Sequence, residues 1–170
     1  MLIRDAARFL AHHAWVERRL FEVVGGWSAD TTDGDVARVL AAQSHHHAWH
    51  ASLFEERVPL LHDLDASELE VPVALVTFVD AVAASGDDVE RLVALARLVV
   101  PELLSRYQAL LDTASPVADA PVARALRLVV TDEQEDWRAA LALLRSHLRT
   151  EGDVVRAAAH QSKLERLLLI

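Results

Sequence analysis

Apolar residues recur at helical spacing along most of the chain, and short breaks divide the pattern into long segments. The first segment covers about residues 2–24 and is expected to end at Gly25-Gly26, because glycine commonly follows the last turn of a helix. The second begins near Asp33 or Asp35, either of which can cap a helix, and ends before Pro59. The pattern predicts two long helices joined by a short loop.

The second half of the chain repeats this plan. A third helix is expected from Asp87 or Asp88 to about Thr113, with a kink at Pro101 inside it. A fourth is expected over about residues 121–149. Because a short loop also joins these two helices, each pair is predicted to form an antiparallel hairpin.

A longer link joins the two hairpins, from Pro59 to Ser85. It contains a short apolar segment over 73–84, which predicts a crossover helix, and residues 67–70 have the spacing of a capping box. A further helix is expected over 153–169. The predicted fold is therefore all-α: one domain over 1–170, with an antiparallel four-helix bundle over 2–149, one long crossover and a C-terminal helix.

Composition narrows the classes of partner and compartment. The chain has no cysteine, which excludes disulfides, thiolate metal sites and thiol catalysis. A net charge of −9 argues against nucleic acid and anionic membranes as partners. The first segment carries Asp5 and Arg8 among its apolar residues, unlike a signal peptide, and no apolar run approaches the roughly 20 residues of a membrane span. A cytoplasmic location is the resulting expectation.

The inward stripes of three predicted helices become polar at mid-length. They are Leu10, His13, Glu17, Leu20, Val24 in the first; Val36, Leu40, Gln43, His47, His50, Phe54 in the second; and Val122, Leu126, Val129, Glu133, Asp136, Ala140, Leu143 in the fourth. Burying such groups costs several kcal/mol unless they are paired or bind a metal. The pattern therefore predicts a shared polar layer inside the bundle.

The third helix contributes less clearly to this layer. Its stronger apolar stripe is Val93, Ala96, Val100, Leu103, Tyr107, Leu111. Glu102 lies at the border of that face, with Arg106 one turn later. Core packing is the favoured interpretation of Tyr107, and also of Trp15, Trp49 and Trp137.

The polar residues have related spacing in the two hairpins. In the first, Glu17 is followed on the next helix by His47 and His50 at i, i+3. In the second, Glu102 is followed on the next helix by Glu133 and Asp136 at i, i+3. An i, i+3 pair places both side chains on one helix face, so that each helix can offer two ligands to one metal ion or to a pair of ions.

In this respect the chain resembles the ferritin-like superfamily, whose four-helix bundles hold two iron or manganese ions through a Glu on the first helix of each hairpin and Glu-x-x-His on the second. The resemblance covers about residues 2–149. It implies metal ligation by Glu17, His47, His50, Glu102, Glu133 and Asp136. Gln43 and His46 offer a second register in the first hairpin, although neither register contains Glu-x-x-His, and the second hairpin has Asp in place of His.

Three functions remain open from the sequence. The resemblance implies an iron or manganese protein that acts as an oxidase or oxygenase on a small molecule. The first alternative is a metal-free helical bundle that serves binding or assembly, with homo-oligomers formed through the apolar C-terminus over 164–170. The second alternative is a mononuclear zinc or nickel site built on the histidines of the second helix.

Overall fold

The computed structural model describes residues 2–168, and the described residues are all-α, without a strand. The α-helices are α1 (Ile3–Asp30), α2 (Gly34–Glu55), α3 (Val73–Ala83), α4 (Asp88–Val93), α5 (Val100–Thr113), α6 (Ala120–His147) and α7 (Glu151–Leu168). A 3₁₀ turn, η1 (Ala66–Leu69), precedes α3, and a π-helical segment, η2 (Ala94–Val99), joins α4 to α5. None of the described helices is long and apolar enough to cross a membrane.

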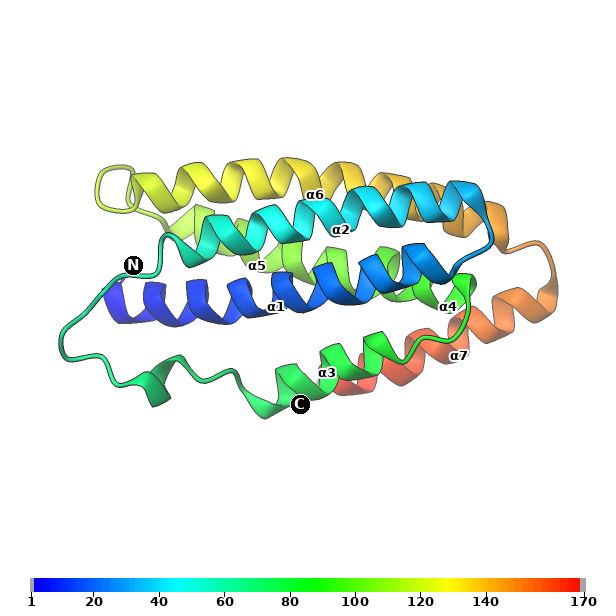
Figure 1. Cartoon of the computed structure of the whole chain (residues 1–170), viewed down its shortest axis with the longest axis horizontal. Helices are drawn as coiled ribbons and strands as arrows, with labels where there is room; N and C mark the ends of the chain where they lie inside the picture. Colours follow the sequence, from blue (N-terminus) through cyan, green and yellow to red (C-terminus); the bar gives the residue numbers. More distant parts are fainter. Residues whose placement is uncertain (1, 169–170) are drawn as a thin grey trace.

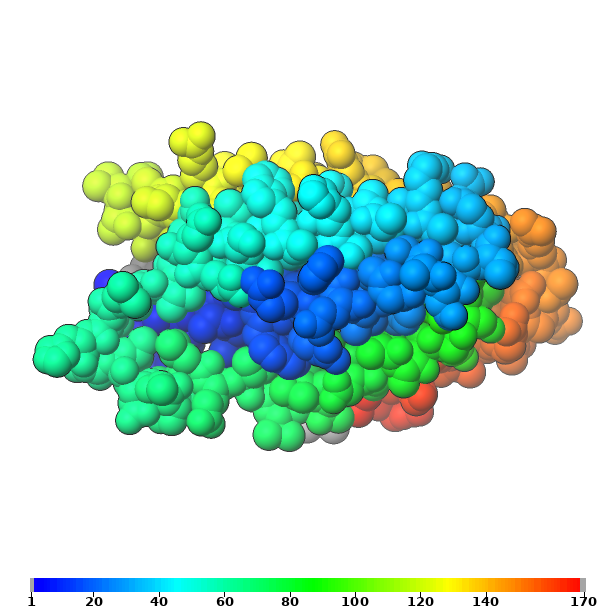
Figure 2. Space-filling model, in the orientation of Figure 1, coloured from blue at the N-terminus to red at the C-terminus, as the bar shows by residue number. Residues whose placement is uncertain are grey.

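The long helices run side by side along the long axis of the molecule (Figure 1). α1 and α2 pack on each other in opposite directions, and so do α5 and α6. α2 also packs on α6, which brings the two pairs together. α3 and α7 contact each other along one side of this group. The link over 59–72 extends at one end of the molecule (Figure 2).

Helix α1 does not end at Gly25-Gly26 as predicted but continues to Asp30. A Cβ on Gly25 would meet Ser44 Oγ at 2.9 Å, and this hydroxyl donates a hydrogen bond to Phe21 O at 2.9 Å. No described glycine has a positive φ. Gly25 therefore permits the close approach of α2 to α1, and it does not act as a helix cap.

The start of α2 was predicted correctly, since the Asp33 carboxylate accepts hydrogen bonds from the Asp35 and Val36 N–H groups. The predicted capping box at 67–70 is wrong. The capping box is formed two residues earlier, by Asp65 and Glu68. Glu68 also pairs with Arg4 and Arg8 of α1, which connects the link to that helix.

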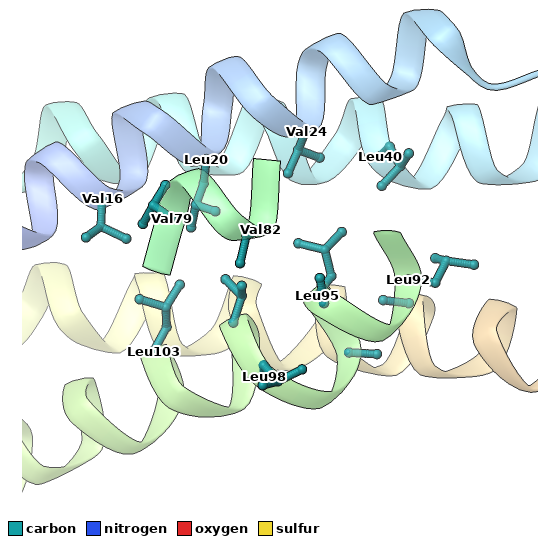
Figure 3. Close-up of a cluster of buried hydrophobic side chains, with 14 of the residues drawn as sticks. Val16, Leu20, Val24, Leu40, Val79, Val82, Leu92, Leu95, Leu98 and Leu103 are labelled. Atoms are coloured by element: carbon teal, nitrogen blue, oxygen red, sulfur yellow. The ribbon is translucent and has the colours of Figure 1, made fainter. Parts of the chain in front are cut away.

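One continuous set of buried apolar side chains joins all seven helices. Figure 3 shows Leu20 and Val24 of α1 facing Val79 and Val82 of α3, with Leu95 of η2 nearby. At the C-terminal end, Leu164 is buried and Leu167 and Leu168 pack against the same core. The last two residues of that segment, Leu169 and Ile170, lie outside the described residues.

The π-helical segment fits the proline that follows it. In the π register each N–H bonds the carbonyl five residues earlier, as Val100 N–H does to Leu95 O. Pro101 has no N–H, so the Ala96 carbonyl lacks its main-chain donor in this register. The Trp137 indole of α6 takes that place, since its Nε1–H donates to Ala96 O at 2.8 Å. The wide turn before Pro101 is thus stabilised by a side chain of the neighbouring helix.

Replacing Trp137 with Phe should lower the free energy of unfolding by about 1–3 kcal/mol, because the Ala96 carbonyl would lose its partner. In a Pro101→Ala background, which restores a main-chain donor, the same replacement should cost less. Urea denaturation of the two single variants and the double variant measures this coupling. Trp49→Phe is the control, since its ring is also partly exposed. An equal cost of Trp137→Phe in both backgrounds would refute this account of Pro101.

Candidate metal centre

Four polar side chains from three helices meet inside the structure: Glu17 from α1, His47 and His50 from α2, and Glu133 from α6. Each is at most 1% exposed. Each offers one nitrogen or oxygen atom, and these four atoms all lie within 4.8 Å of one another. The predicted shared polar layer therefore exists, and this four-residue cluster can hold a metal ion.

The helix geometry explains why these residues meet. Glu17 and Glu133 lie near the middle of α1 and α6, on stripes that are apolar towards both ends. His47 and His50 are one turn apart on the face of α2 that contacts both of these helices. Apolar packing on either side, for example by Leu20 and Phe54, keeps water from the cluster.

The distances within the cluster fit a single small ion. Glu133 Oε1 lies 3.5 Å from His47 Nδ1 and 3.4 Å from His50 Nδ1, and Glu17 Oε2 lies 3.5 Å from His50 Nδ1. A tetrahedral ion with bonds of about 2.0–2.1 Å separates its ligand atoms by about 3.3–3.4 Å. The fourth contact, His47 Nδ1 to Glu17 Oε2, is a hydrogen bond of 2.6 Å that would have to lengthen on ligation.

Several atoms of the cluster have no hydrogen-bond partner within the described part of the chain. They include both carboxylate oxygens of Glu133 and Nδ1 of His50. An unpartnered buried carboxylate is among the most costly arrangements in a protein interior, because it loses its hydration and gains nothing in return. A bound cation would satisfy these atoms, so the residues present fit a metal ion.

Two neighbouring side chains position the cluster. The Tyr107 hydroxyl of α5 donates a hydrogen bond to Glu17 Oε1. Asp132 Oδ2 lies 3.2 Å from His50 Nε2 and accepts a hydrogen bond from its N–H, which leaves Nδ1 as the nitrogen that faces the two glutamates. A carboxylate on the outer nitrogen is the usual partner of a metal-ligating histidine, since it fixes both ring orientation and tautomer.

The electrostatics reflect the crowding of charges. Burial alone would lower the pKa of His50, but its contacts with Glu133 and Glu17 outweigh burial and raise this pKa to about 11. Burial would raise the pKa of Glu17, yet the charge and hydrogen bond of His47 hold it well below its usual range. Burial raises the pKa of Glu133. Without a metal, protonated imidazoles therefore balance the buried carboxylates.

The other two predicted ligands lie outside the cluster. Glu102 is partly exposed, and its Oε1 accepts a hydrogen bond of 2.7 Å from Arg106 Nε. Asp136 is buried, but its Oδ2 lies 2.8 Å from His46 Nδ1. The alternative register also adjoins Asp136, because Gln43 Nε2 donates to its carbonyl oxygen at 2.9 Å. The structure thus brings together four of the six predicted ligands, namely Glu17, His47, His50 and Glu133.

Tyr107 is the contribution of α5 to the polar layer, a role that the sequence interpretation missed. It was interpreted as core packing, and its ring is fully buried against Phe54, with 5.4 Å between the ring centroids. The one signal for its second role was a hydroxyl in the middle of an otherwise apolar stripe. Burial and the nearby Glu17 raise the pKa of Tyr107 well above its ordinary value, so it stays a hydrogen-bond donor.

His13 lies on α1 one turn before Glu17, at the edge of the cluster. Its Nδ1–H donates to Phe9 O at 2.8 Å, its ring stacks on Phe9, and its edge meets Tyr107 at 5.3 Å between ring centroids. Burial lowers the pKa of His13 to about 4. The imidazole of His13 is therefore neutral at physiological pH.

Comparison with known proteins identifies no relative: no protein-family model, no curated protein and no solved structure matches this chain.

Replacing Tyr107 with Phe should destabilise the protein by about 1–3 kcal/mol, because Glu17 Oε1 would lose its donor in a buried setting. In a Glu17→Gln background the same change should cost less, since no buried charge is then left without its partner. Urea denaturation of the four proteins of this cycle gives the coupling. Additive effects of the two changes would show that the hydroxyl does not stabilise the glutamate.

His13 should make stability fall in mild acid. Above a pH of about 6.5 the ring is neutral in both states, whereas at lower pH only the unfolded chain binds the proton until the folded pKa of about 4 is reached. Between about pH 8 and pH 4, the wild type should lose about 3 kcal/mol more than His13→Phe. His45→Gln, at an exposed position, is the control and should follow the wild type. Parallel stability profiles of wild type and His13→Phe would contradict the expectation.

Proposed function

We propose that this chain is a metalloprotein in which Glu17, His47, His50 and Glu133 hold one first-row transition-metal ion. The observation that carries the proposal is the Glu133 carboxylate, which is fully buried with neither oxygen hydrogen-bonded to a described residue. It faces two imidazole nitrogens at distances that suit a shared ion. Asp132 and Tyr107 hold His50 and Glu17 in place for ligation.

We further propose that the arrangement is a divergent form of the ferritin-like four-helix bundle, with α1 and α2 as one hairpin and α4–η2–α5 with α6 as the other. The packing of α1 on α2 and of α5 on α6 supports this topology. The polar layer departs from the pattern of that superfamily, because Tyr107 stands where the third helix would supply a carboxylate. The four clustered ligands accordingly favour one ion over two.

The donor set limits the metals. Imidazoles suit iron, nickel, copper and zinc, whereas carboxylates favour harder ions such as manganese, so the mixture fits iron and manganese as well as zinc and nickel. Iron or manganese would supply redox chemistry, and the proposed activity is then the oxidation of a small molecule. In that setting the surrounding apolar residues exclude water, and Tyr107 fixes the position of the Glu17 carboxylate by donating a hydrogen bond to Oε1.

A mononuclear zinc or nickel site is the second candidate. The observation in its favour is that three of the four nitrogen–oxygen distances, at 3.4–3.5 Å, are close to those between ligands of a tetrahedral ion. Four protein ligands in a closed tetrahedron are typical of structural zinc. In this case the ion would stabilise the fold and carry out no reaction.

Metal analysis of protein purified without chelator tests the site. The wild type should contain about one equivalent, and Glu133→Gln should lose it because a neutral amide is a much weaker ligand. Asp132→Asn should weaken metal binding by about 10–100-fold through loss of the orienting carboxylate. Glu102→Gln is the matched control, since this glutamate lies outside the cluster and should leave the metal content unchanged.

The outcomes separate the candidates. One equivalent of iron or manganese with oxygen uptake supports oxidation, and one equivalent of zinc or nickel supports the second candidate. If the wild type contains two equivalents of metal and the metal content decreases in Glu102→Gln, the single-ion proposal is wrong, and the site holds two ions as in the ferritin-like superfamily. If the wild type binds no metal even after incubation with each of these ions, the proposal fails and a metal-free bundle is left. Circular dichroism confirms that each variant is folded.

A further inference from the structure

A second feature lies beyond the metal centre. A cavity of about 250 Å³, partly open to solvent, lies between α1, α3, η2, α5 and the end of α7. Its walls are apolar and include Val16, Leu20, Leu75, Phe78 and Leu103. In Figure 3, Val16 and Leu20 face Leu103 across the space beside α3. None of the four proposed metal ligands lines it, so the cavity is a separate site.

The size and walls of the cavity favour a small apolar occupant. An apolar cavity of about 150 Å³ is large enough to bind benzene and remains free of ordered water, because water finds too few polar partners there. The present cavity is larger, at about 250 Å³. It therefore has room for a substituted ring or a molecule of similar size.

The two oppositely charged residues of the cavity wall, Glu102 and Arg106, pair with each other. Arg106 donates to Glu102 at 2.7 Å, so these two charges balance each other. Burial keeps His13 neutral at physiological pH, since its pKa is about 4. His12 also lines the cavity, and its buried Nε2 has no hydrogen-bond partner among residues 2–168. The cavity wall thus contains one buried nitrogen without a partner, His12 Nε2, beside an ion pair whose two charges compensate each other.

We propose that this cavity binds an uncharged, mainly apolar small molecule that carries one oxygen, such as a phenol or a cyclic alcohol, and that this oxygen hydrogen-bonds to His12 Nε2. A carboxylate would fit less well, because Glu102 repels it and already occupies Arg106. A pure hydrocarbon would fill the same space but would leave Nε2 without its bond. This proposal does not rest on the metal centre.

Three probes of similar shape test the proposal on the full chain: 4-methylphenol, toluene and 4-methylbenzoate. Titration calorimetry at neutral pH should show one equivalent of 4-methylphenol bound, about 2- to 10-fold more tightly than toluene, which is the range expected for one hydrogen bond. Methylbenzoate should bind most weakly. In His12→Phe the preference for 4-methylphenol over toluene should disappear.

A cavity-filling variant locates the probe. Leu75→Trp places a larger side chain at the α3 wall and should abolish binding, while the protein stays folded by circular dichroism. Leu141→Trp is the matched control, because Leu141 is also partly buried against the core but lies outside the cavity. It should bind the probe like the wild type.

Four results would overturn the proposal. They are the absence of binding to the wild type, equal binding by Leu75→Trp and Leu141→Trp, a tighter complex with methylbenzoate than with 4-methylphenol, and the same 4-methylphenol preference in His12→Phe as in the wild type.

Discussion

The structure depends on how two glutamates are accommodated in a dry interior. Glu17 and Glu133 are both fully buried, where an ionised carboxylate is unfavourable by many kcal/mol unless positive charge or donors surround it. The two histidines of α2 supply that positive charge as protonated rings, or they hold a shared cation that supplies it. Every neighbouring helix contributes to the same end: α1 and α6 bring the acids, α2 brings the imidazoles and α5 brings a hydroxyl. The packing of the long helices is thereby fixed at the centre of the structure.

The centre of the site could be predicted from the sequence because three stripes carry the same signal. Glu17, His47, His50 and Glu133 each interrupt an apolar stripe near the middle of a helix, and burial of the stripes forces the interruptions together. Glu102 had no such support. It lies at the edge of its stripe with an opposite charge one turn away, and a partly exposed ion pair satisfies both groups without a metal. Asp136 lies on the same stripe as Glu133, but its carboxylate is hydrogen-bonded to His46 and does not join the cluster.

The fold was predictable where local signals and tertiary packing agree. Most helices begin and end near the predicted residues, because aspartate caps and prolines act within one turn. Gly25 misled the prediction because glycine has two uses, in helix ends and in close contacts, and only the position of α2 reveals the second. Likewise, Pro101 predicted an irregularity in its helix but did not predict that it would be a π-helical segment. The π-helical segment depends on Trp137, which lies far along the chain and offers no local signal.

The π-helical segment also sets the rotational phase of α5. A π turn contains about one residue more than an α turn, and one residue corresponds to about 100° of rotation around a helix axis. The segment η2 therefore turns everything after Val99 relative to α4, whose side chains are held by α6 and α7. In this phase the Tyr107 hydroxyl meets Glu17. The π-helical segment lies more than about ten ångströms from Tyr107 along the helix axis, at a rise of about 1.5 Å per residue. It thus aligns the Tyr107 hydroxyl with the buried Glu17 from a distance.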